Sequence, residues 1–176
     1  MSLLKDFKIE KYLNAKPPSD NSNTTRQEIN KINKIPIRET FVKEKDDGQK
    51  NFEKIVGPDP LIKQLIDESG PIIGKLKEHY NRPRPKVLAK KFNIDMKDIE
   101  LKTMKTPSYP SGHSVQSYLL GLTLSDKYPE KRDKLMKEAR DISFSRQVAH
   151  AHYPSDSLFG ERIGKDMAMH IKKGSV

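Results

Sequence analysis

The apolar side chains of this chain recur three and four positions apart over most of its length, which is the spacing of one face of an α-helix. No stretch shows the strict alternation of a half-buried strand. The spacing predicts helices at residues 26–34, 60–70, 71–81, from 112 onward, 130–150 and 155–174. We therefore expect an all-α protein, a single-domain bundle of about six core helices.

Prolines and glycines mark the ends of two of these helices. Pro60, preceded by the cap-like Asp59, opens one helix, and Gly70 closes it. Pro71 can open the next helix. That helix must end near Asn81, because the two prolines at positions 83 and 85 push the residues before them toward extended geometry.

Two polar segments interrupt the pattern. Prolines, serines, asparagines and threonines precede position 26 and cannot build a core, so residues 1–25 are predicted as a polar N-terminal arm that ends in a helix cap at Thr24 or Thr25. Residues 43–50 are charged residues around one glycine and predict a solvated turn. The folded domain is expected over residues 26–174.

Composition narrows the class of protein. The chain has 176 residues, 34% hydrophobic and 33% charged, which suffices for one domain with its own core. No stretch approaches the roughly 20 apolar residues of a membrane span, and the N-terminus lacks the apolar run of a secretory signal. Cysteine is absent, which excludes a disulfide framework and a thiolate zinc site. We expect a cytoplasmic protein without a transmembrane segment.

The formal net charge of +10 could attract nucleic acid, an anionic membrane or a small phosphorylated ligand. Lysines in residues 86–105 and 127–137 mostly alternate with acidic or apolar residues, which is typical of a solvated helix face. Tryptophan is absent, and no alternation of basic and aromatic residues predicts a base-stacking platform. We expect no nucleic-acid partner, and the sequence leaves open whether the chain forms a homo-oligomer.

The chemistry is concentrated in a motif near the C-terminus, where Ser145 and Arg146 are followed by His152 and Asp156. Arg146 offers a planar fork of donors to a tetrahedral oxyanion. A ring nitrogen of His152 can attack phosphorus, and Asp156 lies one helical turn further on, where it can hold the ring. These residue types at this spacing describe a phosphate pocket.

Two further motifs lie upstream. One is a Pro-Ser-Gly-His segment that contains Ser111, Gly112 and His113, and the other runs from Lys77 to Arg84 and the proline after it. The motif that begins at a lysine fits in two registers. Lys77 can pair with Arg84 and Pro85, and Lys75 can pair with Arg82 and Pro83. On a helix of about 3.6 residues per turn, lysines two positions apart point to nearly opposite faces, so only one register can face the pocket.

Together these motifs resemble those of the type 2 phosphatidic acid phosphatase superfamily, which read Lys-x6-Arg-Pro, Pro-Ser-Gly-His and Ser-Arg-x5-His-x3-Asp. Every fixed position is present. The closer resemblance is to the soluble class A bacterial acid phosphatases, and it is carried by residues 77–85, 108–113 and 152–156. The prolines that lead to Thr25 and Glu28 also look like the start of that branch's mature domain, so the resemblance covers residues 16–170.

The resemblance implies a role for each motif residue. It makes His152 the nucleophile that forms a phosphohistidine, His113 the general acid and base, and Asp156 the carboxylate that orients His152. It also favours the Lys77 register and implies that the phosphoryl oxygens are bound by Lys77, Arg84, Ser111, Gly112 and Arg146. No metal and no other cofactor is implied.

The predicted function is therefore a metal-independent acid phosphatase acting on small phosphomonoesters. One alternative is a vanadate-dependent haloperoxidase, because vanadate mimics phosphate and those enzymes share the pocket. Another is a non-catalytic basic protein that binds phosphorylated ligands or nucleic acid. His150 is expected to be structural, although an imidazole two residues from His152 could also crowd or tune the pocket.

Overall fold

The computed structural model describes residues 1–175, and within this range the chain forms eight α-helices, three short 3-10 helices and no β-strand. The predicted all-α class is thus confirmed. The α-helices are α1 (Asn23–Asn33), α2 (Glu39–Asp46), α3 (Gly48–Val56), α4 (Pro60–Tyr80), α5 (Pro85–Lys91), α6 (Gly112–Lys127), α7 (Arg132–Val148) and α8 (Pro154–Gly174). The 3-10 helices are η1 (Glu10–Tyr12), η2 (Lys102–Lys105) and η3 (Pro129–Lys131).

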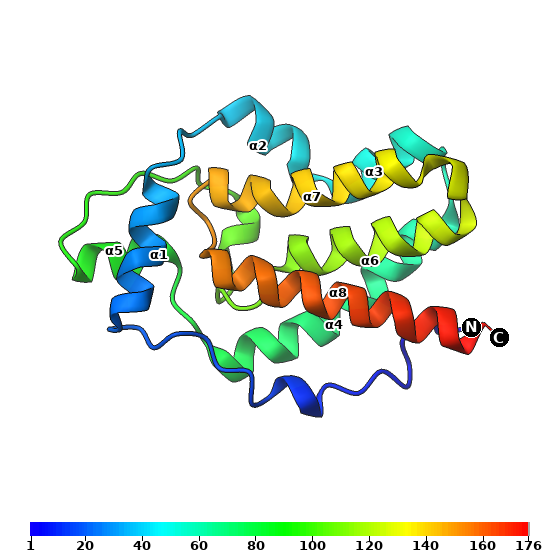
Figure 1. Ribbon diagram of the computed structural model, residues 1–176, viewed down its shortest axis with the longest axis horizontal. Helices are drawn as coiled ribbons and strands as arrows, with labels where there is room; N and C mark the ends of the chain where they lie inside the picture. The colour runs from blue at the N-terminus through cyan, green and yellow to red at the C-terminus, as the bar shows by residue number, and fades with distance from the viewer. Residues whose placement is uncertain (176) are drawn as a thin grey trace.

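Helix α6 is the centre of the bundle (Figure 1). It packs most extensively against α7 and α8, and α4 packs against it as well. The shorter helices α2 and α3 lie along α7, while α1 and α5 lie at one end of the bundle. None of the described helices is both long enough and apolar enough to cross a membrane.

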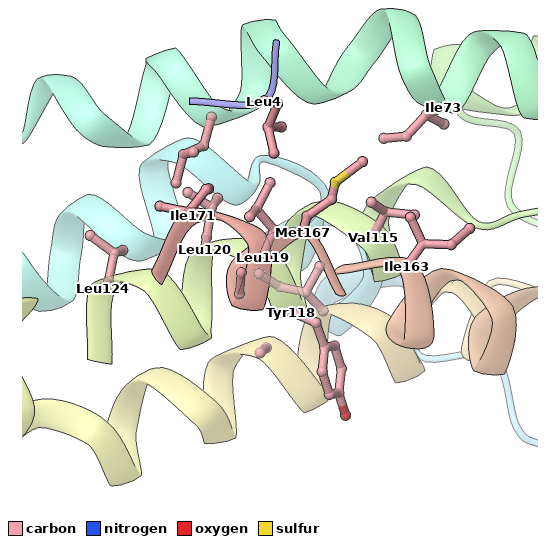
Figure 2. Packing of buried hydrophobic residues seen from close by; sticks show 14 of the residues in the cluster. Leu4, Ile73, Val115, Tyr118, Leu119, Leu120, Leu124, Ile163, Met167 and Ile171 are labelled. Carbon is pink, nitrogen blue, oxygen red and sulfur yellow. The ribbon is translucent and has the colours of Figure 1, made fainter. Parts of the chain in front are cut away.

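The main core lies between α4, α6 and α8. Figure 2 shows Val115, Leu119 and Leu120 of α6 in one cluster with Ile163 and Met167 of α8. All five side chains are almost completely buried. Burial of a large aliphatic side chain contributes about 1.5–3 kcal/mol, so this cluster fixes the position of α6.

Two glycines allow α8 to approach α6 closely. A Cβ at Gly160 would lie 2.6 Å from the carbonyl oxygen of Ser111, and one at Gly164 would lie 2.4 Å from that of Val115. Neither distance is sterically allowed, so no larger residue fits without moving a helix. The close approach places the first turn of α8 beside the first turn of α6.

The N-terminal segment lies against the bundle. Leu4 and Tyr12 are buried in the main core, and the hydroxyl of Tyr12 donates to Asp166 of α8 over 2.5 Å. The carboxylate of Glu68 accepts from two backbone N–H groups of this segment, at 2.8 and 2.9 Å. The division into an arm over residues 1–25 and a domain over residues 26–174 stays a prediction.

Residues 60–80 form one helix instead of the two predicted. Pro71 lies inside α4 with its ring on the exposed side, and the helix continues to Tyr80. A proline in a helix interior costs about 3 kcal/mol or more. The helix continues because one buried stripe runs through the proline, at positions 62, 65, 69, 73 and 76.

Residues 43–50 do not form the predicted solvated turn. They include the end of α2 and the beginning of α3, which are separated only by Asp47, the cap of α3. Each of these helices has one large apolar side chain that is fully buried, Val42 in α2 and Phe52 in α3. Two buried residues ten positions apart give no periodic pattern, so the sequence did not predict these helices.

Smaller differences concern helix ends. Helix α1 begins at Asn23 and is capped by the hydroxyl of Ser22, not by Thr24 or Thr25. Helix α8 begins at Pro154, one residue before the predicted cap. The seven-residue helix α5 was not expected.

Candidate active site

A cavity of about 310 Å³ opens between α4, α6, the C-terminal end of α7 and the loop before α8. Six of the eight residues singled out by the motifs line it: Lys77, Arg84, Gly112, His113, Arg146 and His152. Its other walls are mostly small or apolar and include Gly70, Ile73, Gly74 and Met104. The three motifs, far apart in the sequence, therefore meet around one small cavity.

His152 is held from behind by Asp156. Nδ1 of His152 lies 3.0 Å from Oδ2 of Asp156, which is completely buried in the first turn of α8. The same carboxylate oxygen accepts from the backbone N–H of Tyr153 at 3.0 Å and from the hydroxyl of Ser108. Its other oxygen accepts from Nη1 of Arg82 at 2.8 Å. Asp156 is thus fixed by three donors in addition to the ring.

Arg84 determines which nitrogen of His152 carries the proton. Nη1 of Arg84 lies 2.9 Å from Nε2 of His152. A guanidinium can only donate, so Nε2 must present its lone pair and Nδ1 must carry the hydrogen that Asp156 accepts. The structure thereby presents Nε2, the nitrogen on the cavity side, in its unprotonated form.

Burial and the neighbouring charges determine whether His152 and Asp156 are ionised. Burial lowers the pKa of His152 well below its usual value, and the positive charges of Arg84 and Lys77 lower it further. Burial raises the pKa of Asp156, whereas Arg82, Ser108 and the N–H of Tyr153 act in the opposite direction. The neighbouring guanidinium of Arg82 favours the ionised carboxylate, and the surrounding cations favour a neutral imidazole.

Lys77 lies on the cavity side of α4. It is 8% exposed, and its ammonium group donates to the hydroxyl of Thr106 at 2.9 Å. Burial, with a smaller contribution from the positive charge of Arg84, lowers the pKa of Lys77 to about 7. Lys75, the lysine of the other register, is exposed on the opposite side of the helix.

Arg84 is immobilised by the loop that contains η2. Its Nε donates to the carbonyl oxygen of Thr106 at 2.8 Å, and its Nη2 donates to that of Thr103 at 3.1 Å. Burial lowers its pKa to about 10, which leaves it charged at neutral pH. The loop therefore aims the remaining nitrogen, Nη1, at His152.

The first turn of α6 forms another wall. Ser111 is the N-cap of this helix: its hydroxyl oxygen accepts from the N–H of Ser114 at 3.2 Å, and the residue is fully buried behind the cavity surface. Gly112 lines the cavity, and a Cβ at this position would lie 3.6 Å from Ile73 and 3.9 Å from Lys77. Free N–H groups at a helix N-terminus attract anions, so this wall adds to the positive potential of the three cations.

His113 and Arg146 share one partner, Asp46. Nε2 of His113 lies 2.8 Å from the backbone oxygen of Asp46 and 3.3 Å from its Oδ1, which also accepts from Nη1 of Arg146 at 3.0 Å. Burial lowers the pKa of His113, while Asp46 opposes that shift. Burial also lowers the pKa of Arg146.

Residues 66–171, more than half of the chain, match the model of the PAP2 superfamily. The chain belongs to the PAP2 superfamily. Among curated proteins, it is 33% identical over 97 residues to a non-specific acid phosphatase of Providencia stuartii, an overlap of 54% of this chain and 39% of the relative.

Two other curated relatives carry similar names. A non-specific acid phosphatase of Salmonella typhimurium is 36% identical over 105 residues, covering 59% of this chain and 42% of the relative. An acid phosphatase of Zymomonas mobilis is 32% identical over 100 residues, covering 57% of this chain and 38% of the relative. The PAP2 chain thus aligns with about two fifths of the length of each of these relatives.

Sequence reasoning missed two carboxylates of this PAP2 site, and both lie before the matched segment. One is Asp46, which belongs to the segment predicted as a solvated turn. The other is Glu28 of α1, which accepts from the backbone N–H and the hydroxyl of Ser155 at 2.7 and 2.9 Å and from Nη2 of Arg82 at 3.3 Å. Only the resemblance had singled out Glu28, as part of a domain boundary.

Arg82 is a buried part of the PAP2 site. It is 2% exposed, links Glu28 to Asp156, and stacks its guanidinium over the ring of Tyr153 at 3.7 Å. It does not line the cavity. The second arginine of the Arg-Pro-Arg-Pro run therefore faces the cavity, while the first supports Asp156 from behind.

His150 points away from the cavity of this PAP2 protein. Its ring nitrogens face the carbonyl oxygens of Lys97 and Ile35 at 2.7 and 2.8 Å, and its backbone has a positive φ of 57°. The side chain thus connects two loops, which agrees with the structural role expected for it. Within residues 1–175, no three His, Cys, Asp or Glu side chains are grouped so as to hold a metal ion.

Proposed function

We propose that this chain is an acid phosphatase that hydrolyses small phosphomonoesters through a phosphohistidine on His152, without a metal ion. The observation that carries the proposal is the unprotonated Nε2 of His152, which faces a cavity lined by Lys77, Arg84 and Arg146. Three cations can neutralise the charge that develops on a transferring phosphoryl group. The names of the curated relatives support the same reaction.

In the first step, Nε2 of His152 attacks phosphorus as the ester P–O bond breaks. His113 gives a proton to the leaving oxygen, and the alcohol departs. The imidazole becomes positively charged when the N–P bond forms, and Asp156 stabilises it through the N–H at Nδ1. Nη1 of Arg84, which donates to Nε2 in the free protein, then donates to a phosphoryl oxygen instead.

In the second step, water attacks phosphorus while His113 accepts its proton. The N–P bond breaks, inorganic phosphate is released, and the electron pair returns to Nε2 of His152. The low pKa of His152 suits a reaction in acid, since the nucleophile stays unprotonated where an ordinary imidazole would be charged. The small cavity favours small substrates.

The test is phosphate release from p-nitrophenyl phosphate by the purified protein in EDTA, with and without vanadate, for the wild type and His152→Ala. The matched control is His79→Ala, which removes an exposed histidine that does not line the cavity. We expect metal-independent turnover that vanadate inhibits, that His152→Ala abolishes and that His79→Ala retains. Mass spectrometry after an alkaline quench, which preserves the acid-labile N–P bond, should detect a phosphorylated peptide that contains residue 152.

Full activity of a folded His152→Ala variant would overturn the proposed mechanism. A folded wild type that binds vanadate but turns over no phosphomonoester, across a broad pH range, would overturn the phosphatase assignment. The remaining alternatives would then be a vanadate-dependent haloperoxidase and a non-catalytic protein that binds phosphorylated ligands or nucleic acid.

A further inference from the structure

Asp46, the last residue of α2, contacts both His113 and Arg146. His113 is the second residue of α6, and Arg146 lies in the last turn of α7. The partners are 67 and 100 positions away from Asp46 in the chain. One carboxylate therefore connects the predicted acid with one of the phosphate-binding cations.

The contact fixes the proton on the His113 ring. Nε2 faces two acceptors of Asp46, the backbone oxygen at 2.8 Å and Oδ1 at 3.3 Å. A nitrogen that faces two acceptors must carry a hydrogen. The described residues provide no hydrogen-bond partner for Nδ1, the other ring nitrogen. Nδ1 is thus the nitrogen that can exchange a proton with a ligand.

The charges around His113 oppose its protonation, with one exception. Arg146 of α7 is the nearest cation, and the other titratable groups on the cavity wall are Lys77 of α4, Arg84 and His152. Burial and Arg146 both lower the pKa of His113, whereas Asp46 raises it. Asp46 is the group in this environment that favours an imidazolium.

We propose that Asp46 is a positioning residue of the active site, which holds the Nε2–H of His113 so that Nδ1 delivers the proton to the leaving oxygen and later accepts one from water. The proposal rests on the proposed function. His113 and Asp46 then form a second histidine–carboxylate pair, with the ring nitrogens used in the opposite order from His152 and Asp156. Asp46 also restrains the Arg146 fork at Nη1.

The test compares Asp46→Asn with Asp47→Asn and Asp46→Glu. Asp47 is the exposed neighbour that caps α3, and asparagine caps helices as well as aspartate, so its variant removes the same charge without touching His113. We expect Asp46→Asn to lower kcat about 10²-fold or more and to move the alkaline limb of the kcat/KM profile to lower pH. Asp46→Glu should restore part of the loss, and Asp47→Asn should match the wild type.

A second readout does not depend on turnover. Nitrogen-15 NMR of the wild type, with the His113 signals identified by their loss in His113→Gln, should show a proton on Nε2 when the ring is neutral. The titration midpoint of His113 should fall in Asp46→Asn and stay unchanged in Asp47→Asn. The wild-type measurement tests the proposal even if Asp46→Asn does not fold.

The two readouts separate the possible failures. A wild type without turnover defeats the proposed function, while the NMR data still decide whether Asp46 controls His113. The inference is overturned if the neutral ring carries its proton on Nδ1, or if Asp46→Asn leaves the titration unchanged. It is also overturned if Asp46→Asn is more active and binds phosphate more tightly, since Asp46 would then be a competitor for Arg146.

Discussion

Nη1 of Arg84 lies 2.9 Å from Nε2 of His152, on the side of the ring opposite to Asp156. Nε2, the nitrogen proposed to attack phosphorus, therefore accepts from Arg84, while Nδ1 on the other side of the ring donates to Asp156. We expect Arg84→Met to lower kcat/KM by at least about 10²-fold, by analogy with the loss of an oxyanion donor. Nitrogen-15 NMR should show Nδ1 of His152 protonated in the wild type and also in the variant, because Asp156 still accepts from it. A wild-type ring protonated at Nε2 would contradict this assignment.

Lys77 should reduce the stability of the fold. Its pKa of about 7 in the folded protein lies below the value of 10.5 in the unfolded chain. The charged Lys77 therefore lowers the free energy of unfolding by its full amount below pH 7, and this loss disappears as the pH rises toward 10.5. We expect Lys77→Met to raise the free energy of unfolding at pH 7 by about 1–4 kcal/mol, measured with urea, and by less at pH 9.5. Lys75→Met, on the exposed side of α4, should change it by less than about 0.5 kcal/mol. A less stable Lys77→Met at pH 7 would refute this reading.

Anion binding should weaken as Lys77 loses its proton. Sulfate is a suitable probe because its charge does not change near neutral pH. The pKa values of His113 and His152 are already lowered, so Lys77 is the cavity group expected to titrate above pH 7. Calorimetry at constant ionic strength should show the sulfate Kd rising by up to about tenfold per pH unit above pH 7. Lys77→Met should bind more weakly and show a flat profile; an equal slope in both proteins would assign the titration to another group.

Arg82 and Asp156 should be strongly coupled. Loss of Arg82 leaves the completely buried carboxylate of Asp156 without its cation, which typically costs about 3–5 kcal/mol. We expect this loss of stability in Arg82→Met and a double variant Arg82→Met with Asp156→Asn that is more stable than additivity predicts, by about 1–3 kcal/mol. Arg140→Met, an exposed arginine of α7, is the control. Additive effects in urea denaturation would show that the pair contributes no net interaction.

The sequence predicted the helices whose apolar residues form a continuous stripe. Helices α6, α7 and α8 are of this kind, and their limits differ from the expected ones by a few residues. The prediction from sequence was wrong where tertiary packing overrides the local preference of a residue or segment. Pro71 would end an isolated helix, but the buried side chains on both sides of it, Leu65 and Ile73, hold α4 together. The segment 39–56 is helical because α2 and α3 pack on α7, each with one large buried side chain, Val42 and Phe52. One buried residue per helix gives no periodic pattern in the sequence.

The residues of the candidate site were predictable where they form motifs of fixed spacing. His152 lies two residues before α8 and Asp156 lies in the first turn of that helix, four positions further on, so their contact follows from local geometry. Glu28 and Asp46 could not be found in this way, since their partners lie 127, 67 and 100 positions away. No spacing rule relates such residues, and each is an ordinary charged residue in a polar segment.

The boundaries of the matched segment have a consequence for work with fragments. Residues 66–171 contain all the buried basic residues of the site, but Glu28 and Asp46, which neutralise Arg82 and Arg146, lie before them. A fragment cut at these boundaries would keep the cations and lose two of their counter-ions. A fragment that is to keep both counter-ions must therefore include α1 and α2, which lie outside the region by which the family is recognised.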